Sequence, residues 1–172
     1  GENYNSLIIN PNGWVGFGDD NDAWDNSNIP ASSAPRPAIF GLWDDLNPVN
    51  DNCNPYCSGS VYTHGNSERF VVWFNEVAHW WTNFENTSYD FQIILYPSGK
   101  VDLNYRTLVG NYDASVGIQK NTAIGTQVVY GTDDLSNNLN VTFDISPPWL
   151  TINPDEGTLI EGQSELISLI VN

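Results

Sequence analysis

The stretch FQIILYPSGKVDLNY, residues 91–105, decides the fold class of this chain. Its first six residues place Phe91, Ile93 and Leu95 at every second position, which is the period of a half-buried β-strand. The next four residues place Pro and Gly where a tight turn needs them, and residues 101–105 form a second β-type run. The stretch therefore predicts an antiparallel hairpin.

Short runs of β-branched and aromatic residues recur along the whole chain, and no window of eleven or more residues shows a helical period. The run Arg69–Phe74 is almost continuously apolar, which suits a central strand covered on both faces. Residues 10–13, Asn-Pro-Asn-Gly, mark another tight turn. We expect strands near Ser6–Asn10, Trp14–Phe17, Ala38–Asp44, Ser60–Thr63, Arg69–Val77, Tyr89–Tyr96, Val101–Tyr105, Ala114–Gln119, Gln127–Tyr130 and Asn140–Ile145. The pattern predicts an all-β fold, an antiparallel β-sandwich of jelly-roll-like form with little or no helix.

The charge balance restricts the partners of this chain of 172 residues. It has five Lys and Arg against 21 Asp and Glu, a formal net charge of −16. Phosphate binding needs clustered cations, so the composition practically excludes nucleic acid as a partner. It also argues against binding to an anionic membrane surface. No apolar run is long enough for a membrane-spanning helix, and we expect no membrane insertion. High Asn, Thr, Gly and aromatic content is typical of an extracellular β protein.

Two kinds of modification site fit an extracellular location. Cys53 and Cys57 are close in sequence without a second ligand pair, so a disulfide across their own loop is the main expectation. Free thiols and a metal site are the alternatives. Asn86 and Asn140 begin Asn-x-Ser and Asn-x-Thr sequons and are candidate glycosylation sites.

An acidic loop follows the first predicted hairpin and offers oxygen ligands for calcium. The candidate ligands are Asp19, Asp20, Asp22 and Asp25. Calcium takes six to eight oxygen ligands, which closely spaced Asp and Asn residues can supply. Trp24 occupies the position that the EF-hand spacing reserves for a ligand, so this loop is not an EF-hand. The alternative is a solvated acidic loop without a metal.

A second acidic pair, Asp44-Asp45, ends the predicted strand Ala38–Asp44. Successive strand residues face opposite sides, so one carboxylate should accept backbone N–H groups while the other faces water or a cation. A glycosidase needs two carboxyl groups about 5 to 9.5 Å apart, and nothing marks Asp44 with Glu76 or Asp90 as such a pair. No serine lies in a nucleophile motif. We expect no enzyme.

The connection between the two central predicted strands is rich in aromatic residues. It contains His79, Trp80, Trp81 and Phe84, which we place in a loop. One interpretation is that the aromatic rings fold back over the end of a sheet. The other is an exposed platform that stacks on sugar rings or anchors a protein partner. Under this second interpretation the four residues are candidate ligand or partner contacts.

Six motifs in order resemble an all-β module related to nidogen-like domains. They are INPNGWVGFG, IFGLWDDLNP, SVYTHG, RFVVWFNEV, FQIILYPSGKVDLNY and ASVGIQ, over roughly residues 7–130. Modules of this type recur in large secreted and surface proteins of bacteria and archaea, beside proteases, adhesins and repeat arrays. The resemblance implies a non-catalytic extracellular domain. Such modules usually carry a Phe-rich strand before the first hairpin, and we expect that strand to be missing ahead of Ser6.

Residues 147–172 differ from that module and resemble the first strands of a bacterial immunoglobulin-like domain. We therefore expect a β-sandwich domain over 1–146 and a C-terminal strand extension over 147–172. The extension is too apolar for a free tail, and two strands alone are marginally stable. Its candidate strand-donor residues are Leu150, Ile152, Leu166, Leu169 and Val171.

Three arrangements of the extension are open. A neighbouring copy can accept it, which gives a head-to-tail filament or ring. The same chain can accept it, or the chain can be part of a longer tandem protein. Pro147-Pro148 forms a stiff hinge that favours the first arrangement.

These observations predict a non-catalytic extracellular structural or adhesion module, a filament subunit that assembles by β-strand complementation. The alternative function is a carbohydrate-binding module that uses the aromatic loop, with calcium as a candidate cofactor. The expected partners are other copies or neighbouring domains of a larger surface protein, and glycans under the alternative. A hydrolase is a distant third hypothesis.

Overall fold

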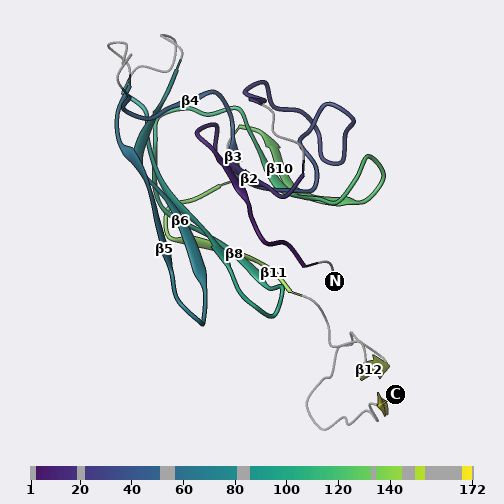
Figure 1. Ribbon diagram of the computed structural model, residues 1–172. Helices are drawn as coiled ribbons and strands as arrows, with labels where there is room; N and C mark the ends of the chain where they lie inside the picture. Colours follow the sequence, from purple (N-terminus) through teal and green to yellow (C-terminus); the bar gives the residue numbers. More distant parts are fainter. Residues whose placement is uncertain are drawn as a thin grey trace, which may run out of the picture.

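The computed structural model describes residues 3–18, 22–50, 57–80, 86–132, 135–144, 150–153 and 168–171. These residues form strands and no helix, which confirms the all-β prediction (Figure 1). The strands are β1 (Ile8–Asn10), β2 (Trp14–Gly16), β3 (Ala38–Trp43), β4 (Leu46–Asn47), β5 (Ser60–Gly65), β6 (Phe70–His79), β7 (Ser88–Leu95), β8 (Val101–Val109), β9 (Ala114–Gln119), β10 (Gly125–Gly131), β11 (Leu139–Phe143), β12 (Leu150–Asn153) and β13 (Ser168–Val171). The described part of the chain contains no helix long and apolar enough to cross a membrane.

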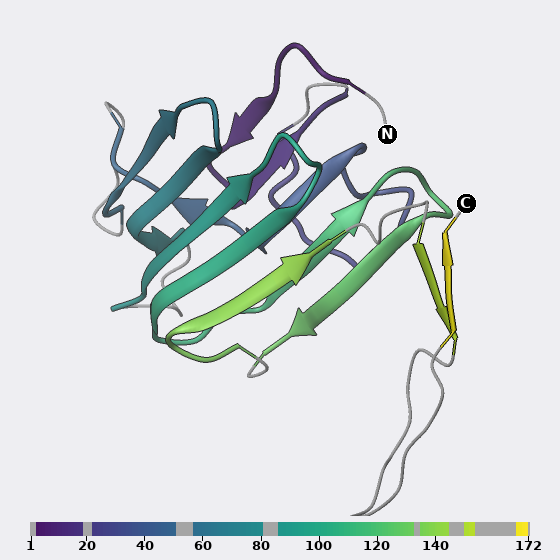
Figure 2. The ribbon, with the colours of Figure 1, turned by 90° about the horizontal axis from the view of Figure 1, so that it is seen from below.

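Two antiparallel sheets form a β-sandwich, as predicted (Figures 1 and 2). One sheet has five strands in the order β1-β2-β3-β9-β10. The other has the order β11-β8-β7-β6-β4, and β5 also pairs with β6. The hairpin predicted from residues 91–105 is the β7-β8 pair, in which Leu95 lies opposite Val101.

The main hydrophobic core lies between the two sheets. Phe74, Phe91 and Leu103 of the six-stranded sheet are fully buried against Leu42 and Val116 of the five-stranded sheet. Phe74 and Phe91 stack with ring centroids 4.6 Å apart. Because aromatic pairs of this kind contribute beyond their buried area, this contact fixes the middle of the sandwich.

The first hairpin needs a glycine at its turn. Gly13 has φ = 81°, a left-handed conformation that other residues adopt at a cost. A Cβ atom there would lie 1.9 Å from the carbonyl oxygen of Leu42, while the Gly13 carbonyl accepts hydrogen bonds from the amides of Gly41 and Leu42. The turn therefore packs directly against β3.

The outer face of the five-stranded sheet is covered by the connection between β2 and β3. A second apolar cluster of Trp14, Phe40 and Trp43 packs there against Ile29 and Ala34 of that connection. Amide side chains of the sheet hold the backbone of the connection, for example Gln127 Oε1, which accepts the amide of Ile29 at 2.8 Å. The strands β2, β3 and β9 of this sheet are therefore buried on both faces.

The outer face of the six-stranded sheet differs. Val72 and Phe74 of β6 point into the core, but Val71 and Trp73 on the other side of the strand are only half-buried. The prediction that Arg69–Phe74 is covered on both faces is therefore wrong. The apolar run supplies side chains to both faces of β6, but no other layer among the described residues packs on its outer face.

Most predicted strands are present with shifted ends, and β9 has the predicted bounds. Strand β6 continues to His79, past the predicted Val77, because its last two residues pair with β4. Strand β8 continues to Val109, past the predicted Tyr105, because a register shift prolongs its pairing with β7. The two-residue strand β4 was not predicted, since it is too short to show a period.

The described strands of the C-terminal extension pair with each other. In this two-stranded sheet Leu150 lies opposite Val171 and Ile152 lies opposite Leu169. Leu166 lies outside the described residues. Among the described strand pairings, neither β12 nor β13 joins one of the two larger sheets.

Candidate functional site

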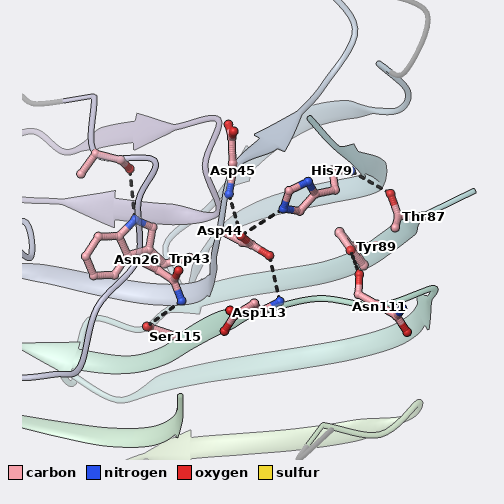
Figure 3. A network of polar contacts seen from close by, with 11 residues as sticks. Asn26, Trp43, Asp44, Asp45, His79, Thr87, Tyr89, Asn111, Asp113 and Ser115 are labelled. Carbon is pink, nitrogen blue, oxygen red and sulfur yellow. Dashed lines mark hydrogen bonds and ion pairs between the residues drawn. The ribbon is translucent and has the colours of Figure 1, made fainter. Parts of the chain in front are cut away.

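The end of β3 carries a buried carboxylate that connects the two sheets. Asp44 is 5% exposed. Its Oδ1 accepts the amide of Asp45 at 2.9 Å and lies 3.2 Å from Nε2 of His79 (Figure 3). Its Oδ2 accepts the amide of Asp113 at 3.2 Å. One carboxylate thus joins the ends of β3 and β6 to the start of β9.

The two acidic residues of this motif have the different roles predicted for them. Asp44 is the buried acceptor of backbone N–H groups, whereas Asp45 is half-buried. Burial raises the pKa of Asp45, and although His79 opposes this shift, the charge of Asp44 reinforces it. The carboxyl group of Asp45 therefore takes up a proton at a higher pH than an ordinary aspartate does.

His79 is the last residue of β6 and is 6% exposed, so its prediction as a loop residue is wrong. Its amide donates to the hydroxyl oxygen of Thr87 at 2.8 Å, and its ring lies beside Asp44 (Figure 3). The strand continues this far because β4 pairs with its end, with Leu46 opposite His79. His79 holds the two sheets together rather than offering an aromatic contact at the surface.

The acidic loop is anchored beside this network. The indole N–H groups of Trp14 and Trp43 both donate to the carbonyl oxygen of Ala23, at 3.0 and 3.1 Å. Asn26 donates to the hydroxyl of Ser115 at 3.2 Å, which fixes the loop to β9 (Figure 3). These contacts place Trp24 and Asp25 between the two anchors and direct them outward, since both are exposed.

A cleft of about 220 Å³ lies where the loop meets the network. Its lining residues are Trp24, Asp25, Asn26, Asp44, Asp45, His79 and Asp113. Four of these seven are aspartates, which concentrates negative charge at this end of the sandwich. Among the residues that the structure describes, no three His, Cys, Asp or Glu side chains are arranged to hold a metal ion.

The calcium ligands predicted from the sequence are only partly described. Asp19 and Asp20 lie outside the described residues, while Asp22 and Asp25 are exposed. Asp25 reaches the acidic cleft, and Asp22 does not line it. Calcium binding by this loop stays a prediction.

The polar side chains of the site form hydrogen bonds with backbone groups. Both oxygens of Asp44 accept backbone amides, and Thr87 accepts the amide of His79. The fully buried Ser115 hydroxyl donates to the carbonyl of Ser27 at 2.6 Å. The hydroxyl of Tyr89 donates to the carbonyl of Asn111 (Figure 3). Such an arrangement stabilises the fold rather than presenting a nucleophile.

Of the remaining predicted contact and modification residues, the structure describes Trp80, Asn86 and Asn140, and none of these three lines the cleft. Trp80 is 44% exposed and its amide donates to the carbonyl of Asp45, while Trp81 and Phe84 lie outside the described residues. Asn86 is an exposed turn residue with φ = 63°, and Asn140 is exposed on β11.

Cys57 is disulfide-bonded. Cys53, the other cysteine of the sequence, lies outside the described residues.

Sequence reasoning missed Asp113 and Thr87 as partners in this network. Each directly precedes a strand, Asp113 before β9 and Thr87 before β7, and each takes part in one hydrogen bond of the network. The available signal was their position near the starts of predicted strands. It was not sufficient, because the sequence does not show which strand ends lie next to each other until the strand order is known.

The fold and the site together define a β-sandwich domain whose buried polar network ties its two sheets together. The chain belongs to the family described as NIDO related, whose model matches residues 1–160. Nidogen-related domains are a non-enzymatic structural type and are typically extracellular. The comparisons found no match among curated proteins or solved structures.

Proposed function

We propose that this chain is a non-catalytic extracellular structural module that assembles with copies of itself through its C-terminal extension. The observation that supports the proposal is the pairing of β12 and β13 with each other instead of with either large sheet. A two-stranded sheet alone is marginally stable in water, so this apolar segment gains most by joining a larger sheet.

The sandwich offers an apolar groove that suits such a segment. The groove has a volume of about 370 Å³ and lies at the end of the five-stranded sheet. Its apolar lining includes Tyr4, Phe17, Ile39, Val101, Ile118 and Ile124. Strand β1 is one edge of the same sheet, and no described strand pairs with its outer side, where a further strand can add.

The occupant we assign to this groove is the extension of a second copy. Its cross-strand pairs Leu150–Val171 and Ile152–Leu169 are apolar, which matches the lining of the groove. A contact between the tail of one copy and the groove of the next is heterologous, so it produces an open filament or a ring. The net charge of −16 on each copy opposes this contact, and added salt should favour it.

Sedimentation velocity of the full chain, compared with a chain that lacks residues 147–172, tests the proposal. The full chain should form larger species as protein and salt concentrations rise, and the shortened chain should stay monomeric. Ile152→Asp should weaken assembly, while the neighbouring change Asn153→Asp provides a matched control. A full chain that is monomeric at high concentration, or a shortened chain that still assembles, would contradict the proposal.

A further inference from the structure

The open face of the six-stranded sheet carries a continuous row of aromatic and amide residues. The strand register places Tyr62 opposite Trp73, Trp73 opposite Gln92, Gln92 opposite Asn104 and Asn104 opposite Asn140. Since residues directly opposite each other in an antiparallel sheet share a face, these five side chains form one row across β5, β6, β7, β8 and β11. We call them the outer row.

Trp73 is held in a fixed orientation within the outer row. Its indole N–H donates to Oδ1 of Asp90 at 3.0 Å, and Asp90 is only 2% exposed. The other oxygen of Asp90 forms an ion pair with Arg106, whose guanidinium also lies 5.9 Å from the centre of the Trp73 ring. Tyr62 lies on the opposite side with its ring centroid 5.6 Å from Trp73 and is 51% exposed.

A groove of about 360 Å³ runs beside Trp73, the inner member of this aromatic pair. Its lining residues are Trp73, Asp90, Gln92, Asn104, Tyr105, Arg106, Asn138, Leu139 and Asn140. Four of them are amides, and each amide side chain both donates and accepts hydrogen bonds. The two charged residues of the lining, Asp90 and Arg106, form an ion pair. The lining therefore offers many neutral hydrogen-bonding groups and little net charge.

We propose that the outer row binds a neutral oligosaccharide. A pyranose ring has an apolar C–H face and a rim of hydroxyl groups, so it needs a flat aromatic surface beside groups that donate and accept hydrogen bonds. Tyr62 and Trp73 supply the aromatic surface. The side-chain amides of Gln92, Asn104 and Asn140 supply the hydrogen-bonding groups. A protein partner would need a more apolar central patch than these amides provide, and an anionic sugar would be repelled by the charge of the domain.

This site differs from the aromatic loop that the sequence suggested for sugar binding. It rests on residues from five strands, whereas the loop around Trp80 is a single connection. Rigid strands hold a binding surface in place before the ligand arrives, which lowers the entropy lost on binding.

The sugar can come from two sources, because Asn140 is also the acceptor of a sequon. A glycan attached there would lie on the outer row and cover the groove. Protein made in bacteria without a glycosylation system leaves the row open to free oligosaccharide. Protein glycosylated at Asn140 should bind the same free oligosaccharide at least tenfold more weakly.

Isothermal titration of the full, unglycosylated chain at a dilute, monomeric concentration tests the proposal. The probes are cellohexaose, laminarihexaose, xylohexaose and mannohexaose, with an oligogalacturonate as the anionic comparison. We expect saturable binding of at least one neutral probe and none of the oligogalacturonate. Tyr62→Ala should weaken binding about tenfold or more, as loss of an aromatic stacking surface does.

The matched control is Tyr130→Ala, because Tyr130 is a tyrosine of similar exposure, 48%, on β10 of the other sheet. It should leave affinity unchanged. Gln92→Ala provides a second variant within the row and should weaken binding without removing an aromatic ring. Thermal unfolding of each variant checks that the fold is retained. Failure of all four neutral probes to bind at millimolar concentration, or equal affinities of Tyr62→Ala and Tyr130→Ala, would overturn the proposal.

Discussion

Replacing Asp44 by alanine tests whether the buried network holds the two sheets together. The carboxylate accepts the amides of Asp45 and Asp113 and contacts the ring of His79, at 2.9, 3.2 and 3.2 Å. Asp44→Ala removes all three contacts at once. These partners lie at the ends of strands from both sheets and in the connection that follows β3, so the change tests their link directly.

The expected loss follows from the number and kind of these contacts. A hydrogen bond to a charged group contributes about 1.5–3 kcal/mol. The two amides lie near solvent and can recover part of this from water, whereas His79 is buried and cannot. Removing one negative charge also relieves repulsion among the aspartates of the cleft, which offsets a further part of the lost stability. We therefore expect Asp44→Ala to lower the free energy of unfolding by about 3 kcal/mol, within the range for breaking a buried pair.

Urea denaturation followed by tryptophan fluorescence measures this change. Asp25→Ala is the matched control, because Asp25 lines the same cleft but is exposed, and it should change stability by at most about 0.5 kcal/mol. The slope of the transition should be the same in all three proteins, since the fold is retained. A loss below about 1 kcal/mol for Asp44→Ala, or equal effects of the two variants, would refute the structural role that we assign to Asp44.

Three further changes have defined outcomes. Burial raises the pKa of Asp45 above its usual 3.8, so the folded chain holds a proton that the unfolded chain releases, and stability falls as pH rises through the folded pKa. Asp45→Asn should therefore stabilise the chain at pH 7, by less than about 1 kcal/mol for this half-exposed group, and the gain should disappear at pH 3.5 in urea titrations. Trp80→Ala should change stability by less than about 1 kcal/mol, because the ring is 44% exposed; a loss of several kcal/mol in the same assay would place it in the core. Millimolar calcium should raise the melting temperature more than sodium chloride of equal ionic strength, through Asp19, Asp20, Asp22 and Asp25; equal melting curves would leave a solvated loop.

The strands were predictable where the local sequence alternates apolar and polar residues and contains its own turn. Residues 91–105 alternate and contain their own turn, and they form β7 and β8. The strand Ala114–Gln119 was predicted with its observed bounds. Strand β4 has two residues and pairs with His79 and Ala78, which lie 33 and 31 positions later, so its formation depends on a partner that local periodicity does not reveal.

The polar sites were less predictable because they form between distant segments. That one of the two aspartates accepts backbone amides followed from strand geometry, but its contact with His79 requires β3 and β6 to end at the same place. The outer row illustrates the same limit. Each of its residues looks like an ordinary outward position, and only the register of β5 through β11 brings Tyr62, Trp73 and the amides into line.

Binding of the detached extension to the shortened chain tests the central claim most directly. A fluorescently labelled peptide of residues 147–172 is titrated with the chain that ends at residue 146, and its anisotropy is recorded. Assembly through the extension predicts saturable binding of one peptide per chain, weakened by Ile152→Asp in the peptide and absent for a scrambled peptide. No binding at micromolar to millimolar concentrations of a shortened chain that unfolds cooperatively would contradict the account.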